Sequence, residues 1–318
     1  PVKRVWIPKP GTMEKRPLGI PVVRDRIVQT ALRMVIEPIF EHRFAEHSYG
    51  FRPGRGCKDA LRRVQVLLDE DYTWIVDADL KGYFDTIPKD RLMSRVAERI
   101  ADSRVLALVR SYLDQGVMEE LTLHEPTERG TPQGAVISPL LANIYLDPLD
   151  HLVAAAGVQM VRYADDFVLL CRSEEQAKAA LARVQAWVAD NGLTLHPDKT
   201  RLVDATRPGG FDFLGYHFER GQKWPRRKAL DRFKDKVRER TPRSSGESME
   251  APIASLNDML RGWFGYFKHS SRDRLDGLDS YIRGRLRSIL RKRMGRRGRG
   301  RRGKRRRHIG RGREERRS

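Results

Sequence analysis

The chain of 318 residues carries 63 lysines and arginines against 42 aspartates and glutamates, which gives a formal net charge of +21. Hydrophobic residues make up 39% of it, enough for a sizeable core, and the length predicts more than one domain. Because no stretch approaches about 18 consecutive apolar residues and no apolar leader opens the chain, we expect neither a membrane span nor a secretory signal, and a cytoplasmic location. Cys57 and Cys171 have no second cysteine or histidine cluster nearby, which predicts buried, reduced thiols.

The positive charge is concentrated at the C-terminal end. Residues 291–318 hold 16 basic and two acidic side chains, a net charge of +14, so residues 1–290 carry only +7. This Arg/Gly-rich segment lacks hydrophobic periodicity, and we expect a disordered tail that binds a polyanion such as nucleic acid. A solubilising extension is the alternative interpretation. The chain begins at Pro1 with residues typical of folded structure, so we expect an upstream part to be missing.

Hydrophobic periodicity predicts the elements of the first two thirds of the chain. Apolar residues from Ile27 to Phe40 recur at helical spacing, which predicts a packed helix over 25–44. Ser138 and Pro139 supply an N-cap and a first-turn proline for a further helix. The other expected elements are helices at 57–69, about 89–100, 103–115 and 174–191, a strand at 74–80, and a hairpin of strands 159–163 and 167–171. This order predicts a mixed α+β domain.

The composition changes near residue 224. Beyond Pro225 the pattern predicts helices only, interrupted by a loop of Pro, Ser and Gly at 241–252. Two apolar stripes at helical spacing follow: Ile253, Leu256, Leu260, Trp263, Phe264 and Phe267, then Leu275, Leu278, Ile282, Leu286 and Ile289. We therefore expect a small helical domain over 225–290.

Three aspartates are placed where folding alone does not explain them. Asp79 ends an apolar strand, and Asp165 and Asp166 occupy the expected hairpin turn. Carboxylates brought together repel one another and lose solvation, so such a cluster usually needs a cation. Hard oxygen ligands select Mg²⁺, or Mn²⁺, over zinc. A solvated acidic turn is the alternative for the Asp165-Asp166 pair taken alone.

Seven short segments occur in an order that matches one family. They are Arg16–Pro21, Ser48–Pro53, Asp79–Asp85, Gly130–Gly134, Tyr163–Asp166, Gly192–Lys199 and Phe213–Tyr216. This succession resembles the ordered blocks of group II intron reverse transcriptases. The resemblance runs from about residue 3 to residue 290, because residues 256–267 also resemble the maturase, or thumb, segment of that family.

The resemblance implies a right-hand polymerase. Fingers and palm would occupy residues 1–224 and a helical thumb or maturase domain residues 225–290, followed by the tail at 291–318. Asp79, Asp165 and Asp166 would form the catalytic, metal-binding triad for two Mg²⁺ ions, or Mn²⁺. The implied reaction joins a primer 3′-hydroxyl to the α-phosphate of a dNTP on an RNA template. The implied partners are RNA template, primer, dNTPs and group II intron RNA.

The resemblance also implies nucleotide contacts. Lys9 and Arg16 would lie over the triphosphate, Phe84 would lie under the sugar and exclude a 2′-hydroxyl, and Gln133 would hydrogen-bond the nucleotide. Lys199 would contact phosphate or act as general acid for pyrophosphate. The alternatives are a solvated basic loop for Lys9 and Arg16, a core aromatic for Phe84 and a surface lysine for Lys199.

Some features of the family are not matched, and more than one function is open. Tyr49, Phe51 and Arg52 are expected to shape the template channel, although Phe51 also suits a core position.

The family's additional N-terminal block and its C-terminal nuclease region are not matched, so we do not expect DNA cleavage. Alternatives to a polymerase are a maturase that binds intron RNA without polymerising, and a domesticated reverse transcriptase in bacterial defence.

Overall fold

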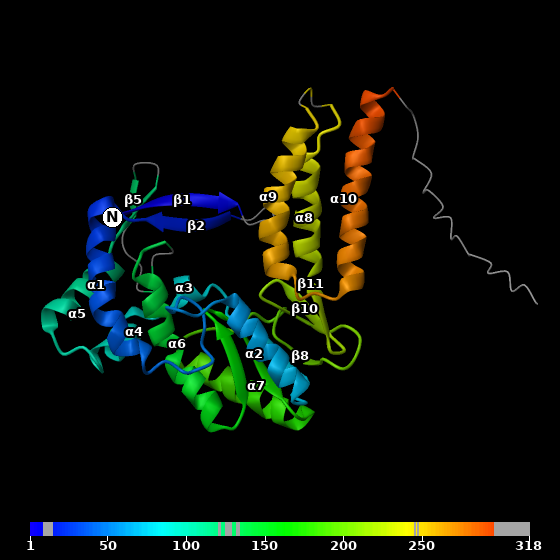
Figure 1. Ribbon diagram of the computed structural model, residues 1–318. Coiled ribbons are helices and arrows are strands. Elements are labelled where there is room, and N and C mark those ends of the chain that lie inside the picture. Colours follow the sequence, from blue (N-terminus) through cyan, green and yellow to red (C-terminus); the bar gives the residue numbers. More distant parts are fainter. Residues whose placement is uncertain are drawn as a thin grey trace, which may run out of the picture. The chain divides into compact units, whose positions relative to one another are not determined.

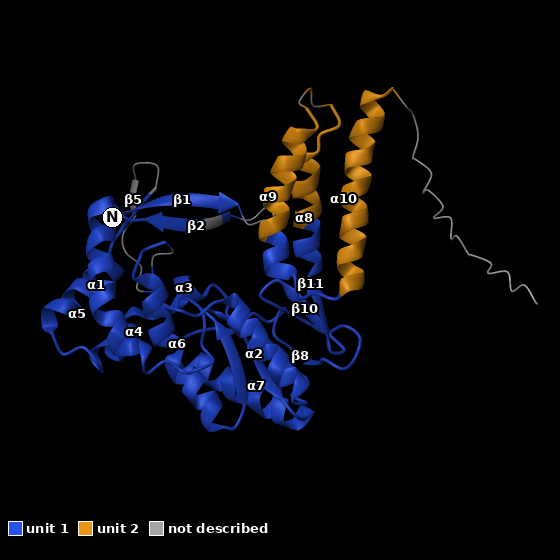
Figure 2. Cartoon of the chain, in the orientation of Figure 1, with its two compact units in different colours: residues 1–231, 263–271 blue, residues 232–262, 272–318 orange. Residues whose placement is uncertain are grey.

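The computed structural model describes residues 1–8, 15–119, 122–124, 129–131, 134–244, 246 and 248–295. The chain forms two compact units (Figure 2): unit 1 holds residues 1–231 and 263–271, and unit 2 holds residues 232–262 and those from 272 onward. The helices are α1 (Val23–Glu41), α2 (Cys57–Asp69), α3 (Tyr83–Thr86), α4 (Lys89–Ala97), α5 (Ser103–Leu113), α6 (Ser138–Ala155), α7 (Glu174–Asp190), α8 (Arg227–Arg240), α9 (Glu250–Phe267) and α10 (Arg272–Arg293). The strands are β1 (Val2–Pro8), β2 (Lys15–Ile20), β3 (Trp74–Asp79), β4 (Val117–Glu119), β5 (Thr122–His124), β6 (Gln159–Tyr163), β7 (Asp166–Cys171), β8 (Arg201–Asp204), β9 (Phe211–Phe213), β10 (Tyr216–Glu219) and β11 (Gln222–Pro225).

A four-stranded antiparallel sheet forms the centre of unit 1 (Figure 1). Its strand order is β6-β7-β3-β8, and both of its faces are covered. Because successive side chains of a strand point to opposite faces, Val76 and Phe167 pack into one core with α6 and α7. Ile75 and Val168 pack into a second core with α2 and the strands β9 and β10. Two cores on one sheet account for the nearly continuous apolar sequence of β3 and β7.

Two smaller sheets complete unit 1. One has the order β2-β1-β4-β5 and contains the N-terminal hairpin of β1 and β2. The other, β11-β10-β9, holds the C-terminal end of α9. There the Tyr266 hydroxyl donates to the Leu214 carbonyl and the Tyr216 hydroxyl donates to the Tyr266 carbonyl, each at 2.7 Å. The Phe267 ring lies 5.0 Å from the Tyr216 ring, so buried aromatic side chains fix this helix end to the sheet.

Unit 2 is helical and consists of most of α8 and α9 together with α10. Val237 and Ile289 are buried in it. The Arg285 guanidinium donates to the carbonyl of the buried Thr241 at 2.6 Å and to its hydroxyl at 3.0 Å, which satisfies backbone that follows the end of α8. Across the residues that the structure describes, no helix is both long and apolar enough to cross a membrane.

The α+β order expected from the sequence is confirmed, and the helix predicted at 57–69 has those bounds. Three local expectations are wrong. Ser138 is the first residue of α6 rather than its N-cap, which is Ile137. Asp166 is the first residue of β7, so the hairpin turn contains only Ala164 and Asp165. The apolar face of α1 is wider than the surface it packs against, and Ile27 is 65% exposed.

The expectation for the C-terminal segment holds only in part. The sequence predicts disorder over the whole segment 291–318, but α10 continues to Arg293. The residues from 296 onward lie outside those described.

Both cysteines are free thiols as expected. Cys171 is buried, whereas Cys57 at the start of α2 is only half-buried.

One histidine of the small sheet should make the stability of unit 1 depend on pH. His217 Nδ1 lies 2.7 Å from Asp212 Oδ1 and Nε2 lies 3.5 Å from Glu219 Oε2. The hydrogen bond to Asp212 raises the pKa of His217 above its usual value. The stabilisation is therefore fully present below about pH 6.5, the ordinary histidine pKa, and is lost as pH rises through the raised folded pKa.

Urea unfolding at pH 6 and pH 8 measures this effect. We expect the free energy of unfolding of the His217→Gln variant to fall less between the two pH values than that of the parent protein. His42→Gln is the control, because His42 is exposed and its Nδ1 lies 2.9 Å from the Pro38 carbonyl oxygen. Equal pH dependence in the parent and in His217→Gln would contradict the assignment.

Candidate active site

The register of β3 and β7 brings the acidic residues together. Asp79 pairs with Asp166 at the end of the two strands. The period-2 alternation places Asp77, Asp79 and Asp166 on the same face of the sheet, the face on which Val168 packs against α2. Asp165 precedes Asp166 in the two-residue turn between β6 and β7. The acidic residues thus lie at the same end of the two strands, where the second core ends.

The carboxylates at this sheet end influence one another. Burial, followed by the charges of Asp77, Asp165 and Asp79, raises the pKa of Asp166 to about 7. Burial also raises the pKa of Asp77, although Arg201 Nε lies 3.1 Å from its carboxylate. Carboxylates that perturb each other in this way form a site of high negative potential, and their oxygens are the donors that a hard divalent cation prefers. The donor set therefore suits Mg²⁺ or Mn²⁺.

A lysine contacts the acidic cluster directly. Lys199 Nζ lies 2.5 Å from Asp79 Oδ2. Within the described ranges, no three His, Cys, Asp or Glu side chains converge to a metal-binding geometry, and the Asp79 carboxylate pairs with this ammonium group. The backbone fixes the lysine's segment, because the His196 amide donates to the Asp79 carbonyl at 2.7 Å and the Lys81 amide donates to the Thr194 carbonyl at 2.8 Å. The sequence block Gly192–Lys199 is thereby joined to the end of β3.

Phe84 lies on the short helix α3, five residues after Asp79. Its half-buried ring meets the ring of Tyr83 edge-on at 5.6 Å and that of Phe51 at 6.4 Å. The Phe84 carbonyl accepts a hydrogen bond of 2.7 Å from the Thr131 amide, which places the block Gly130–Gly134 beside α3. Phe84 therefore combines core contacts with partial exposure.

The strand β2 approaches the same block. Gly134 has φ +106°, and a Cβ atom there would lie 2.9 Å from the Gly19 carbonyl oxygen of β2. Arg16 lies on β2 opposite Ile7, and its side chain is outside the described atoms. The predicted contacts Lys9 and Gln133 also lie outside the described residues. Their roles stay predictions.

Arg52 does not have the position expected of a residue that lines a template channel. It is 6% exposed, and its guanidinium pairs with Glu41 at 2.8 Å and donates to the carbonyls of Ala45 and Ser48. Arg52 therefore holds the loop after α1 to the end of that helix. Tyr49 is buried, whereas Phe51 is 44% exposed and has φ +61°, so Phe51 does not belong to the core.

Sequence reasoning missed three residues that shape this site. Asp77 was detectable, because it is two residues before Asp79 and must share its face. Gly50 passes so close to the hairpin turn that a Cβ atom would lie well inside contact distance of the Ala164 nitrogen and 2.8 Å from the Tyr163 carbonyl carbon. Arg162 is fully buried beside the turn, and no local pattern distinguishes it from an exposed strand residue.

Comparison with known proteins identifies the family to which this arrangement belongs. The model of the family "Reverse transcriptase (RNA-dependent DNA polymerase)" matches residues 7–218. The chain belongs to the reverse transcriptase family. A second model, "Group II intron, maturase-specific domain", matches residues 230–308. Both matches agree with the family indicated by the seven sequence blocks.

Individual relatives of this reverse transcriptase are similar over part of their length. It is 35% identical to protein YkfC of Escherichia coli K12 over 259 residues, covering 69% of this chain and 67% of YkfC. It is 40% identical over 153 residues to the group II intron-encoded protein LtrA of Lactococcus lactis subsp. cremoris, covering 48% of this chain but only 25% of LtrA. The chain thus spans about two thirds of one relative and a quarter of the other.

A solved structure shows the same fold. The telomerase of Candida albicans, in complex with a fragment of telomeric RNA, aligns with a TM-score of 0.54 at 14% identity, covering 91% of this chain and 59% of the telomerase chain. At this identity the likeness concerns the fold alone. It confirms the α+β right-hand polymerase fold that the sequence implied.

Replacing Gly50 tests the close packing at the turn of this reverse transcriptase. Because the added Cβ would meet the backbone of the Asp165 turn, we expect Gly50→Ala to lower the free energy of unfolding by about 1–3 kcal/mol or more. Urea denaturation followed by circular dichroism measures the change. The control is Gly56→Ala, where the nearest atom to the new Cβ is Asp59 Oδ2 at 3.8 Å. The loss there should stay within about 1 kcal/mol, and an equal loss in both variants would contradict the packing argument.

Proposed function

We propose that the chain is an RNA-directed DNA polymerase of the group II intron type, which extends a primer 3′-hydroxyl with dNTPs on an RNA template. The observation that carries the proposal is the pairing of Asp79 with Asp166, with Asp165 in the adjoining turn. Phosphoryl transfer requires positioning and charge stabilisation more than covalent catalysis. The acidic sheet end would supply both through the divalent cations that its carboxylates hold. The family match over residues 7–218 supports the same reaction class.

Asp79, Asp165 and Asp166 would hold two divalent cations, Mg²⁺ or Mn²⁺. When bound, such ions lower the pKa of the attacking hydroxyl and neutralise the departing pyrophosphate. The carboxylates would fix where that charge is placed, and burial together with the neighbouring carboxylates raises the pKa of Asp166 to about 7. In this proposal, primer and triphosphate would meet at the end of the sheet that carries the acidic triad.

The residues around the triad would orient the nucleotide. Lys199, with its ammonium group already at the acidic cluster, can donate to phosphate oxygens or protonate pyrophosphate. Phe84 presents a flat ring on which a sugar without a 2′-hydroxyl can lie. Lys9, Arg16 and Gln133 keep their predicted roles on the triphosphate and the nucleotide.

The loss of one carboxylate tests the reaction. We expect Asp165→Ala to reduce primer extension on an RNA template by roughly 10³-fold, because removing a metal ligand costs several kcal/mol of transition-state stabilisation. Asp90→Ala is the matched control, since Asp90 is 87% exposed and pairs with Arg110 on the surface. Incorporation of labelled dNTP gives the rate. Full extension by the folded Asp165→Ala variant would refute the assignment.

Phe84 should select deoxyribonucleotides. Because the Phe84→Ala variant opens space beside the sugar, we expect the ratio of rNTP to dNTP incorporation to rise roughly tenfold or more. Single-nucleotide incorporation with each substrate on the same primer and template gives the ratio. Phe264→Ala, at an aromatic that is 54% exposed on α9, should leave it unchanged. An unchanged ratio in Phe84→Ala would make Phe84 an ordinary packing residue.

A maturase role is the second candidate, and the match of the maturase-specific domain to residues 230–308 favours it. The described part of that region is basic: α8 carries seven basic and three acidic side chains, and α10 ends in Arg291, Lys292 and Arg293. Such helices suit binding to the phosphate backbone of an intron RNA. The two roles can coexist, and the Asp165→Ala variant separates them, because assistance to RNA splicing would survive the loss of that carboxylate.

A further inference from the structure

Arg162 is a fully buried charged residue on β6, an edge strand of the central sheet. It is 0% exposed on β6. Its Nε and one terminal nitrogen donate to the two carboxylate oxygens of Asp150 on α6, at 2.7 and 2.5 Å. The other terminal nitrogen donates to the Ala164 carbonyl and to the Asn143 side-chain oxygen, both at 2.9 Å. One guanidinium thus joins α6 to the turn that carries Asp165.

The same network extends to Gly50. The Asn143 side-chain nitrogen donates to the Gly50 carbonyl at 2.8 Å, so Asn143 connects Arg162 to the backbone that lies against the turn. The backbone of Arg162 takes part as well: its amide donates to the His47 carbonyl at 3.0 Å and its carbonyl accepts from the Tyr49 amide at 2.8 Å. Arg162 therefore fixes the turn from one side and the Gly50 loop from the other.

The turn needs such support for two reasons. Ala164 has φ +60°, a left-handed conformation that is unfavourable for a residue other than glycine. The turn also carries Asp165 next to Asp166 and Asp79, whose charges repel one another. Both effects favour other conformations of this loop when no cation is bound. The hydrogen bond that the Arg162 guanidinium donates to the Ala164 carbonyl stabilises the observed conformation against these alternatives.

We propose that Arg162 is a positioning residue for the metal site: held by Asp150, it fixes the Ala164 carbonyl and, through Asn143, the Gly50 backbone, and so preorganises the turn that carries Asp165 and Asp166. The proposal rests on the proposed function, in which those aspartates bind divalent cations. Arginine is required because its planar fork serves Asp150, Asn143 and Ala164 at once, whereas lysine is a single point of charge. Stability alone is a weak reason for the pair, since buried ion pairs can often be replaced by apolar residues without loss.

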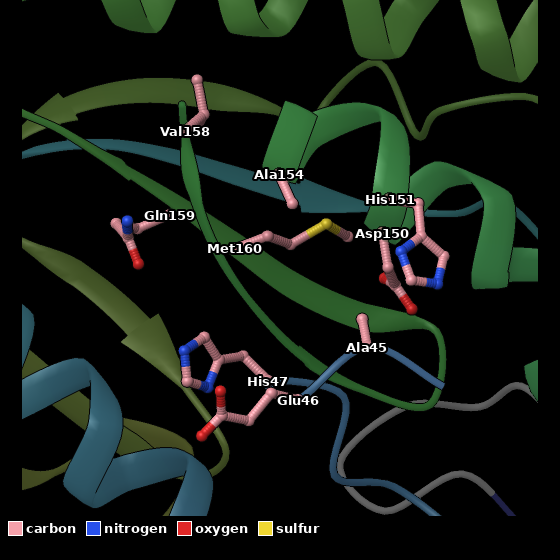
Figure 3. A pocket seen from close by; sticks show the side chains of 9 residues that line it. All are labelled: Ala45, Glu46, His47, Asp150, His151, Ala154, Val158, Gln159 and Met160. Atoms are coloured by element: carbon pink, nitrogen blue, oxygen red, sulfur yellow. The ribbon is translucent and has the colours of Figure 1, made fainter. Parts of the chain in front are cut away.

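The site of Asp150 borders open space. Asp150 lines a pocket of about 330 Å³ that His47, His151 and Met160 also line (Figure 3). A side chain somewhat larger than aspartate at this position can extend toward the pocket without overpacking. Asp150→Asn and the double variant Arg162→Met with Asp150→Leu are therefore useful beside Arg162→Lys. The double variant removes the donor to Ala164 together with both buried charges.

The test is the equilibrium binding of Mn²⁺ to the full chain without nucleic acid or nucleotide. Electron paramagnetic resonance measures the concentration of free Mn²⁺. In Arg162→Lys, Asp150→Asn and the double variant we expect the affinity to fall about 10–100-fold, the usual effect of removing a residue that orients metal ligands. Asp147→Asn is the matched control. Asp147 lies one turn earlier on α6, and its carboxylate accepts a hydrogen bond from the Ala45 amide at 3.4 Å. This variant should bind Mn²⁺ with an affinity within about twofold of that of the parent protein.

Primer extension over a range of Mg²⁺ concentrations gives the second readout. A positioning role predicts a higher Mg²⁺ concentration at half-maximal rate, whereas a smaller folded fraction would lower all rates by one factor. The double variant remains informative if Arg162→Lys does not fold. Mn²⁺ affinity within twofold of the parent in the folded variants would overturn the inference while leaving the proposed function intact. If the parent protein binds Mn²⁺ but does not extend primers, the proposed function fails, and the binding of the variants still tests the role of Arg162.

Discussion

The register between β3 and β7 is the constraint on which the site depends. It sets Asp79 opposite Asp166, and it also assigns the apolar residues of both strands to their two cores. A slip by one residue would turn Asp79 toward the core that contains Val76 and Phe167, because side chains alternate between the faces. Folding and chemistry therefore require the same pairing. The energy of the two cores maintains an arrangement of carboxylates that would not form by itself.

The resulting crowding of negative charge is only partly relieved by the protein. Arg201 pairs with Asp77 and Lys199 pairs with Asp79, whereas burial and its acidic neighbours raise the pKa of Asp166 to about 7. A chain with a net charge of +21 thus contains one strongly acidic point. Basic residues elsewhere can attract a nucleic acid without sequence preference, and in the proposed function the acidic point would be where divalent cations bind.

The sequence allowed prediction of features that are set by neighbouring residues and left out those set by distant ones. The helix at 57–69 and the hairpin around Asp165 follow from periodicity and turn position, so they were predictable. The exposure of Ile27 was not, since it depends on how much of α1 its partners cover. Arg162 is the clearest case: only the fold shows that Asp150, twelve residues earlier, meets it inside the protein. The same holds for Gly50. It has no room for a Cβ atom because it packs against a turn more than a hundred residues away in the sequence.

Backbone and side chains differ in how firmly the site holds them. Gly50, Asn143 and Arg162 fix the backbone of the turn through buried contacts that solvent cannot replace. Lys199, by contrast, is 59% exposed, and an exposed ion pair contributes at most about 1 kcal/mol. The Asp79 carboxylate can therefore exchange its lysine partner for another cation at little cost, while its position on β3 stays the same. An ammonium group released in this way would remain next to the acidic cluster, within reach of the phosphate groups that the proposed reaction brings there.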